Sequence, residues 1–120
     1  MRLILLICML MLTSCVAEES AEITPQDVIS QMESSNVMIL DVRNPREFDS
    51  GHIPGAVLLP LARLEAEVKN FIPDLDQVIY VYCQTGRRSR NAQSILKKMG
   101  FTAVYDLGGI VDWTGEIVRP

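Results

Sequence analysis

The chain has 120 residues, which is enough for one domain and too few for two. Its content of 48% hydrophobic and 22% charged residues is typical of a globular protein with a buried core and excludes a disordered chain. The net charge of −4 argues against nucleic acid as a partner, because binding to phosphate backbones depends on an excess of basic residues.

The first residues have the layout of a secretory signal. Met1-Arg2 supplies one positive charge, residues 3–12 are an unbroken apolar run, and Thr13-Ser14-Cys15 follows with small side chains. The apolar run is far shorter than the roughly 20 residues that a membrane-spanning helix needs. The segment therefore predicts export rather than a membrane span.

Leu12-Thr13-Ser14-Cys15 resembles the lipobox of bacterial lipoproteins. The resemblance implies a signal peptide over 1–14, a lipid on Cys15 and a polar tether over 15–22. Several acyl chains would anchor the protein stably. Because Val16 follows in place of the aspartate of the enteric inner-membrane retention signal, we expect a periplasm-facing protein on the outer membrane. The alternative is an ordinary signal peptide with an incidental cysteine.

Helix and strand signals alternate along the rest of the chain, each marked by apolar spacing or by a start signal such as Thr24-Pro25 or Asn44-Pro45. The predicted elements are a very short strand at Ile23, a helix from Thr24, a strand over 37–41, a helix over 45–49, a strand over 56–59, a helix over 61–72, a strand over 78–82, a helix over 88–99, a strand over 102–105, and a short helix holding Trp113.

This alternation predicts an α/β domain over 23–120, with a small parallel sheet of about five strands and helices on both faces. Ligands of such sheets bind at the C-terminal ends of the strands. Asp41 and Cys83 both follow predicted strands. We therefore expect the two side chains to share one rim of the sheet.

Cys83 is the candidate reactive residue. It follows an apolar strand and opens a loop, containing Gly86, that leads into a helix, where the helix dipole and backbone N–H groups favour a thiolate. Arg87 and Arg88 add positive charge. Of the chain's 3 cysteines, Cys8 would leave with the signal and Cys15 would be acylated, so Cys83 has no partner for a disulfide. The alternative is an inert buried cysteine.

Three segments, 41–56 (DVRNPREFDSGHIPGA), 83–89 (CQTGRRS) and 107–113 (LGGIVDW), resemble the signatures of single-domain rhodaneses, which are thiosulfate sulfurtransferases. The resemblance covers residues 22–119, although the stretch after Trp113 is compressed. It implies a rhodanese-like fold and a persulfide on Cys83, formed from thiosulfate or another sulfane-sulfur donor and passed to cyanide in an assay or to a thiol in the cell.

The resemblance also implies roles for individual residues. The residues expected to hold the persulfide and the donor are Gln84, Thr85, Gly86, Arg87 and Arg88. Asp41, with Arg43, is expected to support the loop from the neighbouring strand. The alternatives for Asp41 are an ion pair with Arg43 or a cap on helix 45–49. His52 is expected in a structural turn and Trp113 in the core.

Two other functions remain open. Phosphatases and arsenate reductases of similar fold use Cys-x5-Arg, whereas here the arginine is the fifth residue after Cys83 and the sixth is Ser89. A non-enzymatic carrier, sensor or partner-binding module would keep the fold with negligible turnover. With a single histidine and one free cysteine, no familiar zinc or haem spacing can be built, so no metal and no cofactor is expected.

Overall fold

The structure, a computed structural model, describes residues 23–34 and 36–120. The predicted signal peptide, Cys15 and the tether lie outside the described residues. Within the described part of the chain, no helix has both the length and the apolar character needed to cross a membrane. The elements are α1 (Pro25–Ser34), β1 (Val37–Asp41), α2 (Pro45–Ser50), β2 (Val57–Leu58), α3 (Leu61–Phe71), β3 (Val78–Cys83), α4 (Arg87–Lys98), β4 (Val104–Gly109) and the 3-10 helix η1 (Ile110–Asp112).

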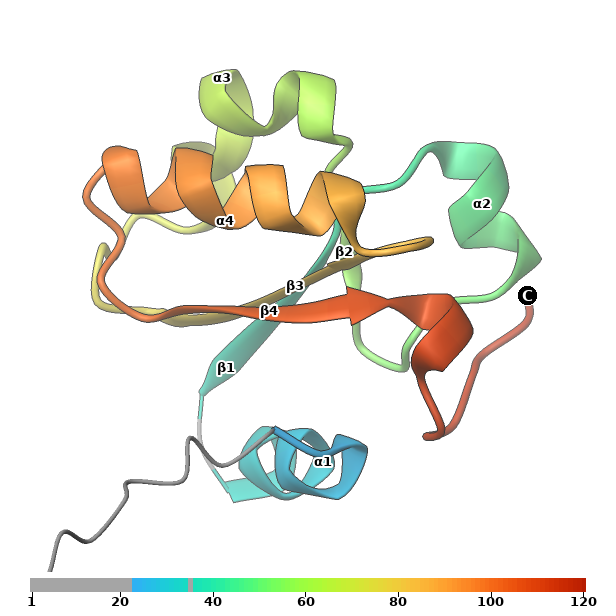
Figure 1. The fold of residues 1–120 in the computed structure, drawn as a ribbon. Coiled ribbons are helices and arrows are strands. Elements are labelled where there is room, and N and C mark those ends of the chain that lie inside the picture. The colour runs from blue at the N-terminus through green and yellow to red at the C-terminus, as the bar shows by residue number, and fades with distance from the viewer. Residues whose placement is uncertain (1–22, 35) are drawn as a thin grey trace, which may run out of the picture.

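The sheet is parallel, in the order β2-β1-β3-β4. Helices α3 and α4 cover one face, α1 lies on the other, and α2 lies beyond the C-terminal ends of the strands (Figure 1). The predicted α/β class, the parallel sheet and the helices on both faces are therefore confirmed. Strand β3 is an inner strand that pairs with β1 on one side and with β4 on the other. Its C-terminal end is therefore held from both sides.

The described residues form four strands, one fewer than expected. Ile23 is 39% exposed and lies in no strand, because the helix start at Thr24-Pro25 follows it at once. The last strand begins later than expected and runs on through Gly108-Gly109, which pair with the end of β3 after a bulge. The final helix is a single 3-10 turn, and Trp113 follows it at the edge of the α1-side core, half-buried.

Both predicted helix starts are confirmed in detail. The Thr24 hydroxyl accepts a hydrogen bond from the Asp27 N–H at 3.2 Å, and the Asp27 carboxylate accepts one from the Thr24 N–H at 3.0 Å. The Asn44 side chain accepts from the Glu47 N–H at 2.8 Å, and Glu47 accepts from the Asn44 N–H at 3.2 Å. Such reciprocal caps satisfy N–H groups that the first helical turn leaves unpaired.

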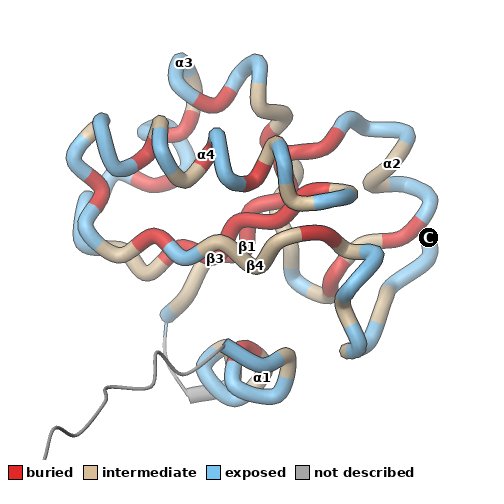
Figure 2. The backbone as a smooth tube through the Cα atoms, viewed as in Figure 1, coloured by how far each residue is buried: buried red, intermediate tan, exposed pale blue. Residues whose placement is uncertain are grey.

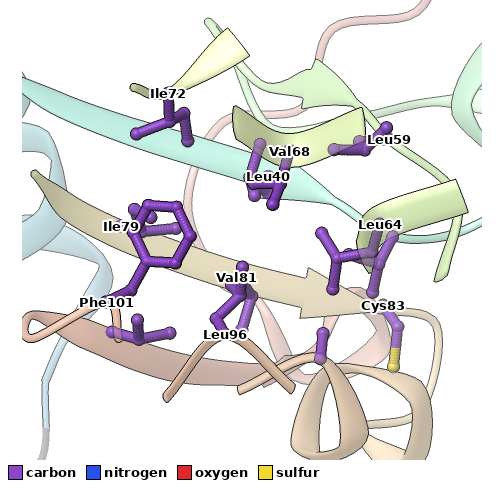
Figure 3. Packing of buried hydrophobic residues seen from close by; sticks show 13 residues of the cluster. Leu40, Leu59, Leu64, Val68, Ile72, Ile79, Val81, Cys83, Leu96 and Phe101 are labelled. Atoms are coloured by element: carbon purple, nitrogen blue, oxygen red, sulfur yellow. The ribbon is translucent and has the colours of Figure 1, made fainter. Parts of the chain in front are cut away.

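Two apolar clusters sandwich the sheet, and burial is concentrated on the strands and on the helix faces that meet them (Figure 2). The alternation of β3 divides its side chains between them. Ile79, Val81 and Cys83 join the cluster under α3 and α4, whereas Tyr80 and Tyr82 join the cluster on the α1 side. Cys83 therefore lies at the end of the larger cluster, beside the start of α4 (Figure 3).

Candidate active site

The candidate site lies where β3 ends and α4 begins. Cys83 is the last residue of β3, residues 84–86 form the loop, and α4 starts at the next residue. Gly86 has a φ of 97°, a left-handed conformation that glycine adopts without strain, and it turns the loop into the helix. Asp41 pairs with Tyr82 in the parallel ladder. Asp41 and Cys83 therefore share one rim of the sheet, as predicted.

The sulfur of Cys83 lies between the apolar cluster and the polar loop. The backbone N–H of Gly86 donates to Sγ at 3.0 Å, and Oγ of Ser89 lies 3.6 Å from Sγ. Only 1% of Cys83 is exposed, because the loop covers the sulfur. The thiol therefore contacts apolar side chains on one side and hydrogen-bonding groups of the loop and of α4 on the other. An inert core cysteine would be surrounded by apolar groups alone.

The pKa of the Cys83 thiol is lowered from its ordinary value of 9.0. Burial raises the pKa, but hydrogen bonds from the Ser89 hydroxyl and from backbone N–H groups of the loop outweigh that effect. These N–H groups belong to Ser89, Gly86 and Thr85. All of these groups belong to the loop or to the first turn of α4. Hydrogen bonds from this short segment therefore lower the pKa of the thiol more than the charges of the arginine side chains do.

Ser89 should control the pH at which Cys83 reacts. Replacing Ser89 with alanine removes a hydroxyl that stabilises the thiolate, so the pKa of the Cys83 thiol should rise and alkylation should begin at higher pH. The measurement is the pH dependence of alkylation, followed by mass on the peptide that holds Cys83. Ser94→Ala, at an exposed serine of the same helix, is the matched control. An unchanged midpoint in Ser89→Ala would show that the amides alone set the pKa.

Gly109 lets the loop pack against β4. A Cβ atom at this position would lie 2.5 Å from the Gln84 carbonyl oxygen and 2.7 Å from the Thr85 Cα, both of them backbone atoms. The Val111 N–H then donates to the Gln84 carbonyl at 3.3 Å, which fastens the loop to the start of η1. Glycine is therefore required at position 109, because a Cβ atom there would collide with the backbone of the loop.

Asp41 and Arg43 form a buried ion pair that reaches the loop. Asp41 is fully buried and Arg43 is 2% exposed, with 2.6 Å between Arg43 Nη2 and Asp41 Oδ2. Arg43 also donates to the Gly51 carbonyl at 2.7 Å and to the Gln84 side-chain oxygen at 3.1 Å. Asp41 thus forms the ion pair with Arg43, and Arg43 in turn contacts the loop at Gln84, whereas Asn44 provides the cap on α2.

The two loop arginines differ in their surroundings. Arg88 donates two hydrogen bonds to the Glu47 carboxylate, each at 2.8 Å, in a bidentate ion pair between α4 and α2. This pair raises the pKa of Arg88 and lowers the pKa of Glu47. Arg87 is exposed and has no hydrogen-bond or ion-pair partner among the described residues. Gln84 and Thr85 lie between these arginines and Cys83 in the chain.

His52 occupies a structural turn, as predicted. Its ring stacks on Phe48 with 3.8 Å between centroids, Nδ1 lies 3.0 Å from the Phe48 carbonyl oxygen, and its backbone forms a bridge with Val118. These contacts fix the turn between α2 and β2. Across residues 23–34 and 36–120, no three histidine, cysteine, aspartate or glutamate side chains lie close enough together to hold a metal ion.

The family model described as "Rhodanese-like domain" matches residues 24–116. The chain belongs to the rhodanese-like domain family. A solved structure described as "rhodanese with anions from E. coli" matches with a TM-score of 0.66 and 34% identity, covering 69% of this chain and 98% of that one. The match to the family model and the match to this solved structure therefore agree on the family and the fold.

Two curated relatives differ in what their names say. The "Thiosulfate sulfurtransferase PspE" of Escherichia coli (strain K12) is 37% identical over 73 residues, which are 61% of this chain and 70% of that protein. The "Putative sulfur carrier protein YrkF" of Bacillus subtilis (strain 168) is 42% identical over 104 residues, which are 86% of this chain and 54% of that protein. The chain thus spans about half of the second relative.

The three rhodanese-like segments meet at one place in the fold. The first supplies the buried pair of Asp41 and Arg43, the second is the loop at Cys83, and the third brings Gly109 against the loop backbone. Gln84 connects the three segments. Arg43 holds its side chain, and its backbone lies against Gly109.

Sequence reasoning missed Ser89 and Glu47 as residues of the site. Ser89 is fully buried, and its hydroxyl donates to the Gly86 or the Gly108 carbonyl, at 3.1 and 3.3 Å. A signal was present, because Ser89 continues the buried stripe of Ala92 and Leu96 toward the start of α4. For Glu47, the local capping pattern was visible, but its second partner on α4 was not.

Proposed function

We propose that the chain is a sulfurtransferase that moves the sulfane sulfur of thiosulfate to a thiol through a persulfide on Cys83. The observation that carries the proposal is the setting of the sulfur: an N–H donor at 3.0 Å and a serine hydroxyl at 3.6 Å, at the first turn of α4. Membership of the rhodanese-like family and the similarity to a named thiosulfate sulfurtransferase support it.

The reaction has two half-steps. The Cys83 thiolate attacks the outer sulfur of thiosulfate, a new S–S bond forms, and the bonding electrons of the donor leave with sulfite. The persulfide carries one negative charge. An acceptor thiolate then attacks its terminal sulfur and restores the Cys83 thiolate. In an assay cyanide takes the same sulfur and gives thiocyanate.

The residues in and around the loop have different roles in this reaction. N–H groups over 84–88 hold the persulfide anion, and two of them, at Thr85 and Gly86, also favour the thiolate before it. Arg87, which is exposed and unpaired among the described residues, attracts the anionic donor. Arg43 holds the loop through Gln84 while Asp41 neutralises its charge.

The experiment that tests the chemistry is a mass measurement after incubation with thiosulfate. One extra sulfur should appear on the peptide holding Cys83 and should disappear on addition of cyanide or a thiol. A peptide whose mass does not change, in protein whose Cys83 is free to alkylate, would contradict the proposal.

A slow persulfide carrier is the second candidate function. It is favoured by the covered sulfur, since Cys83 is 1% exposed, and by the similarity to a protein named a putative sulfur carrier. The turnover number distinguishes the two functions. An enzyme completes many cycles per minute, whereas a slow carrier loads one sulfur atom per molecule and releases it without many cycles per minute. Phosphatase chemistry is not proposed, because Arg88 falls one residue short of Cys-x5-Arg and is bound to Glu47.

We also infer that the protein is lipid-anchored through Cys15 and faces the periplasm from the outer membrane. Replacing Cys15 with serine should release the protein from the membrane pellet into the soluble fraction, because the acceptor of the lipid is lost. The measurement is an immunoblot of membrane and soluble fractions. Cys83→Ser, which leaves the lipobox intact, is the control and should stay with the membranes. A Cys15→Ser variant that still pellets contradicts the anchor.

A further inference from the structure

The end of the chain returns to the candidate active site. After η1 the backbone runs back toward the end of α2 (Figure 1), and the Trp113 indole N–H holds this stretch by donating to the Glu116 carbonyl at 3.1 Å. Val118 then exchanges two backbone hydrogen bonds with His52, at 2.9 and 2.8 Å. This bridge fixes the backbone next to Arg119. The compressed stretch after Trp113 therefore brings a basic residue back to α2.

Arg119 lines a pocket that reaches the loop. The pocket has a volume of about 230 Å³, and Gln84 of the loop and Gly51 at the end of α2 also line it. A Cβ atom added at Gly51 would lie 3.6 Å from Cγ of Arg119, so the stem of the arginine side chain lies against the end of α2. Because Gln84 directly follows Cys83 in the chain, this pocket adjoins the residue that takes up sulfur in the proposed reaction.

Arg119 carries the uncompensated positive charge of this pocket. The pocket has a second guanidinium, that of Arg43, but this group is buried and is paired with Asp41 at 2.6 Å. Arg119 is exposed and has no hydrogen-bond or ion-pair partner within residues 23–34 and 36–120. None of the residues that line the pocket is acidic. The donors of Arg119 are therefore free to bind an anion.

From this placement we propose that Arg119 binds the anionic end of the sulfur donor in the pocket beside Gln84. The proposal rests on the sulfur-transfer function proposed above and adds to it a residue of the C-terminal segment. The planar guanidinium can donate to two sulfonate oxygens of thiosulfate at once. The Cys83 thiolate then takes the outer sulfur, the S–S bond of the donor breaks, and sulfite leaves with the electron pair. One negative charge stays on the persulfide and two leave with sulfite, so charge is conserved.

The first test is the steady-state kinetics of Arg119→Gln with thiosulfate. Glutamine removes the charge of an exposed side chain, so the fold should be kept. The KM for thiosulfate should rise roughly fivefold, the upper range for one exposed charge pair, and kcat should change less than about twofold. Arg119→Lys restores the charge and should recover most of the loss. The matched control is Arg63→Gln, which removes the same charge from an exposed pair on α3 and should leave KM unchanged.

The second test requires no sulfur transfer. Cys83 is alkylated with iodoacetate, which is an anion, and in parallel with iodoacetamide, which is its neutral analogue. The rate is followed by mass on the peptide that holds Cys83. In Arg119→Gln the rate with iodoacetate should fall roughly fivefold, because the charge that attracts the reagent is lost, whereas the rate with iodoacetamide should stay the same.

The two tests separate this inference from the function on which it rests. An unchanged KM in Arg119→Gln, an equal rise of KM in Arg63→Gln, a lysine that recovers nothing, or equal slowing of both alkylating reagents would overturn the role of Arg119. If the iodoacetate rate depends on Arg119 but thiosulfate adds no sulfur to Cys83, the anion-binding pocket stands and the proposed function itself fails.

Discussion

Replacing Cys83 with serine should abolish sulfur transfer and leave the fold in place. A serine hydroxyl stays protonated at neutral pH and forms no persulfide, so turnover should fall by at least about three orders of magnitude, to the background rate. Serine has nearly the shape of cysteine, and its hydroxyl can accept from the Gly86 N–H. The loss in free energy of unfolding should therefore stay near about 1 kcal/mol.

The measurement is cyanide-dependent formation of thiocyanate from thiosulfate, with thermal unfolding followed in parallel. Cys15→Ser, kept in detergent, is the matched control for a lost cysteine and should retain turnover. Thiocyanate above background from a folded Cys83→Ser protein would refute the persulfide on this residue.

The second large effect is expected at the buried ion pair. Arg43→Met keeps most of the side-chain volume but leaves the fully buried Asp41 carboxylate without its partner. Loss of one member of such a pair costs about 3–5 kcal/mol, because the remaining charge stays buried and uncompensated. It also frees the Gln84 side chain, so sulfur transfer should fall in the molecules that remain folded.

Urea unfolding measures this loss. Arg63→Met breaks the exposed pair with Glu67 and should change the free energy of unfolding by only about 0.5 kcal/mol. In a double variant, Asp41→Asn with Arg43→Met, stability should partly return, because no charge is left buried alone. Equal losses in Arg43→Met and Arg63→Met would contradict the structural role of the buried pair.

The features that depend on local pattern were predictable from the sequence. Thr24 and Asn44 cap helices because their partners lie three residues away, and the turn from β3 into α4 at Gly86 is a local event. The alternation of strands and helices then predicts the parallel sheet, and the sheet predicts the shared rim of Asp41 and Cys83. All of this follows from residues close together in the chain.

The features that depend on distant partners were not predictable. The bonds from Arg43 to Gln84 and from Arg88 to Glu47 each join residues 41 positions apart, and no spacing rule connects them. The sequence therefore offered the ion pair with Arg43 as one of three possible roles of Asp41 and named no partner for Arg88. The extension of β4 through Gly109 was missed because glycine is a poor strand former, and only its close approach to Thr85 explains it.

The covered position of the thiol has a consequence for oxidation. A disulfide between two molecules requires their Cβ atoms to come within about 4 Å of each other. A sulfur that lies beneath its own loop, 1% exposed, does not reach that distance from a second copy while the loop stays closed. Air oxidation of the folded protein should thus give no Cys83-linked dimer, and Cys83 should stay available as a thiol under conditions that cross-link exposed cysteines.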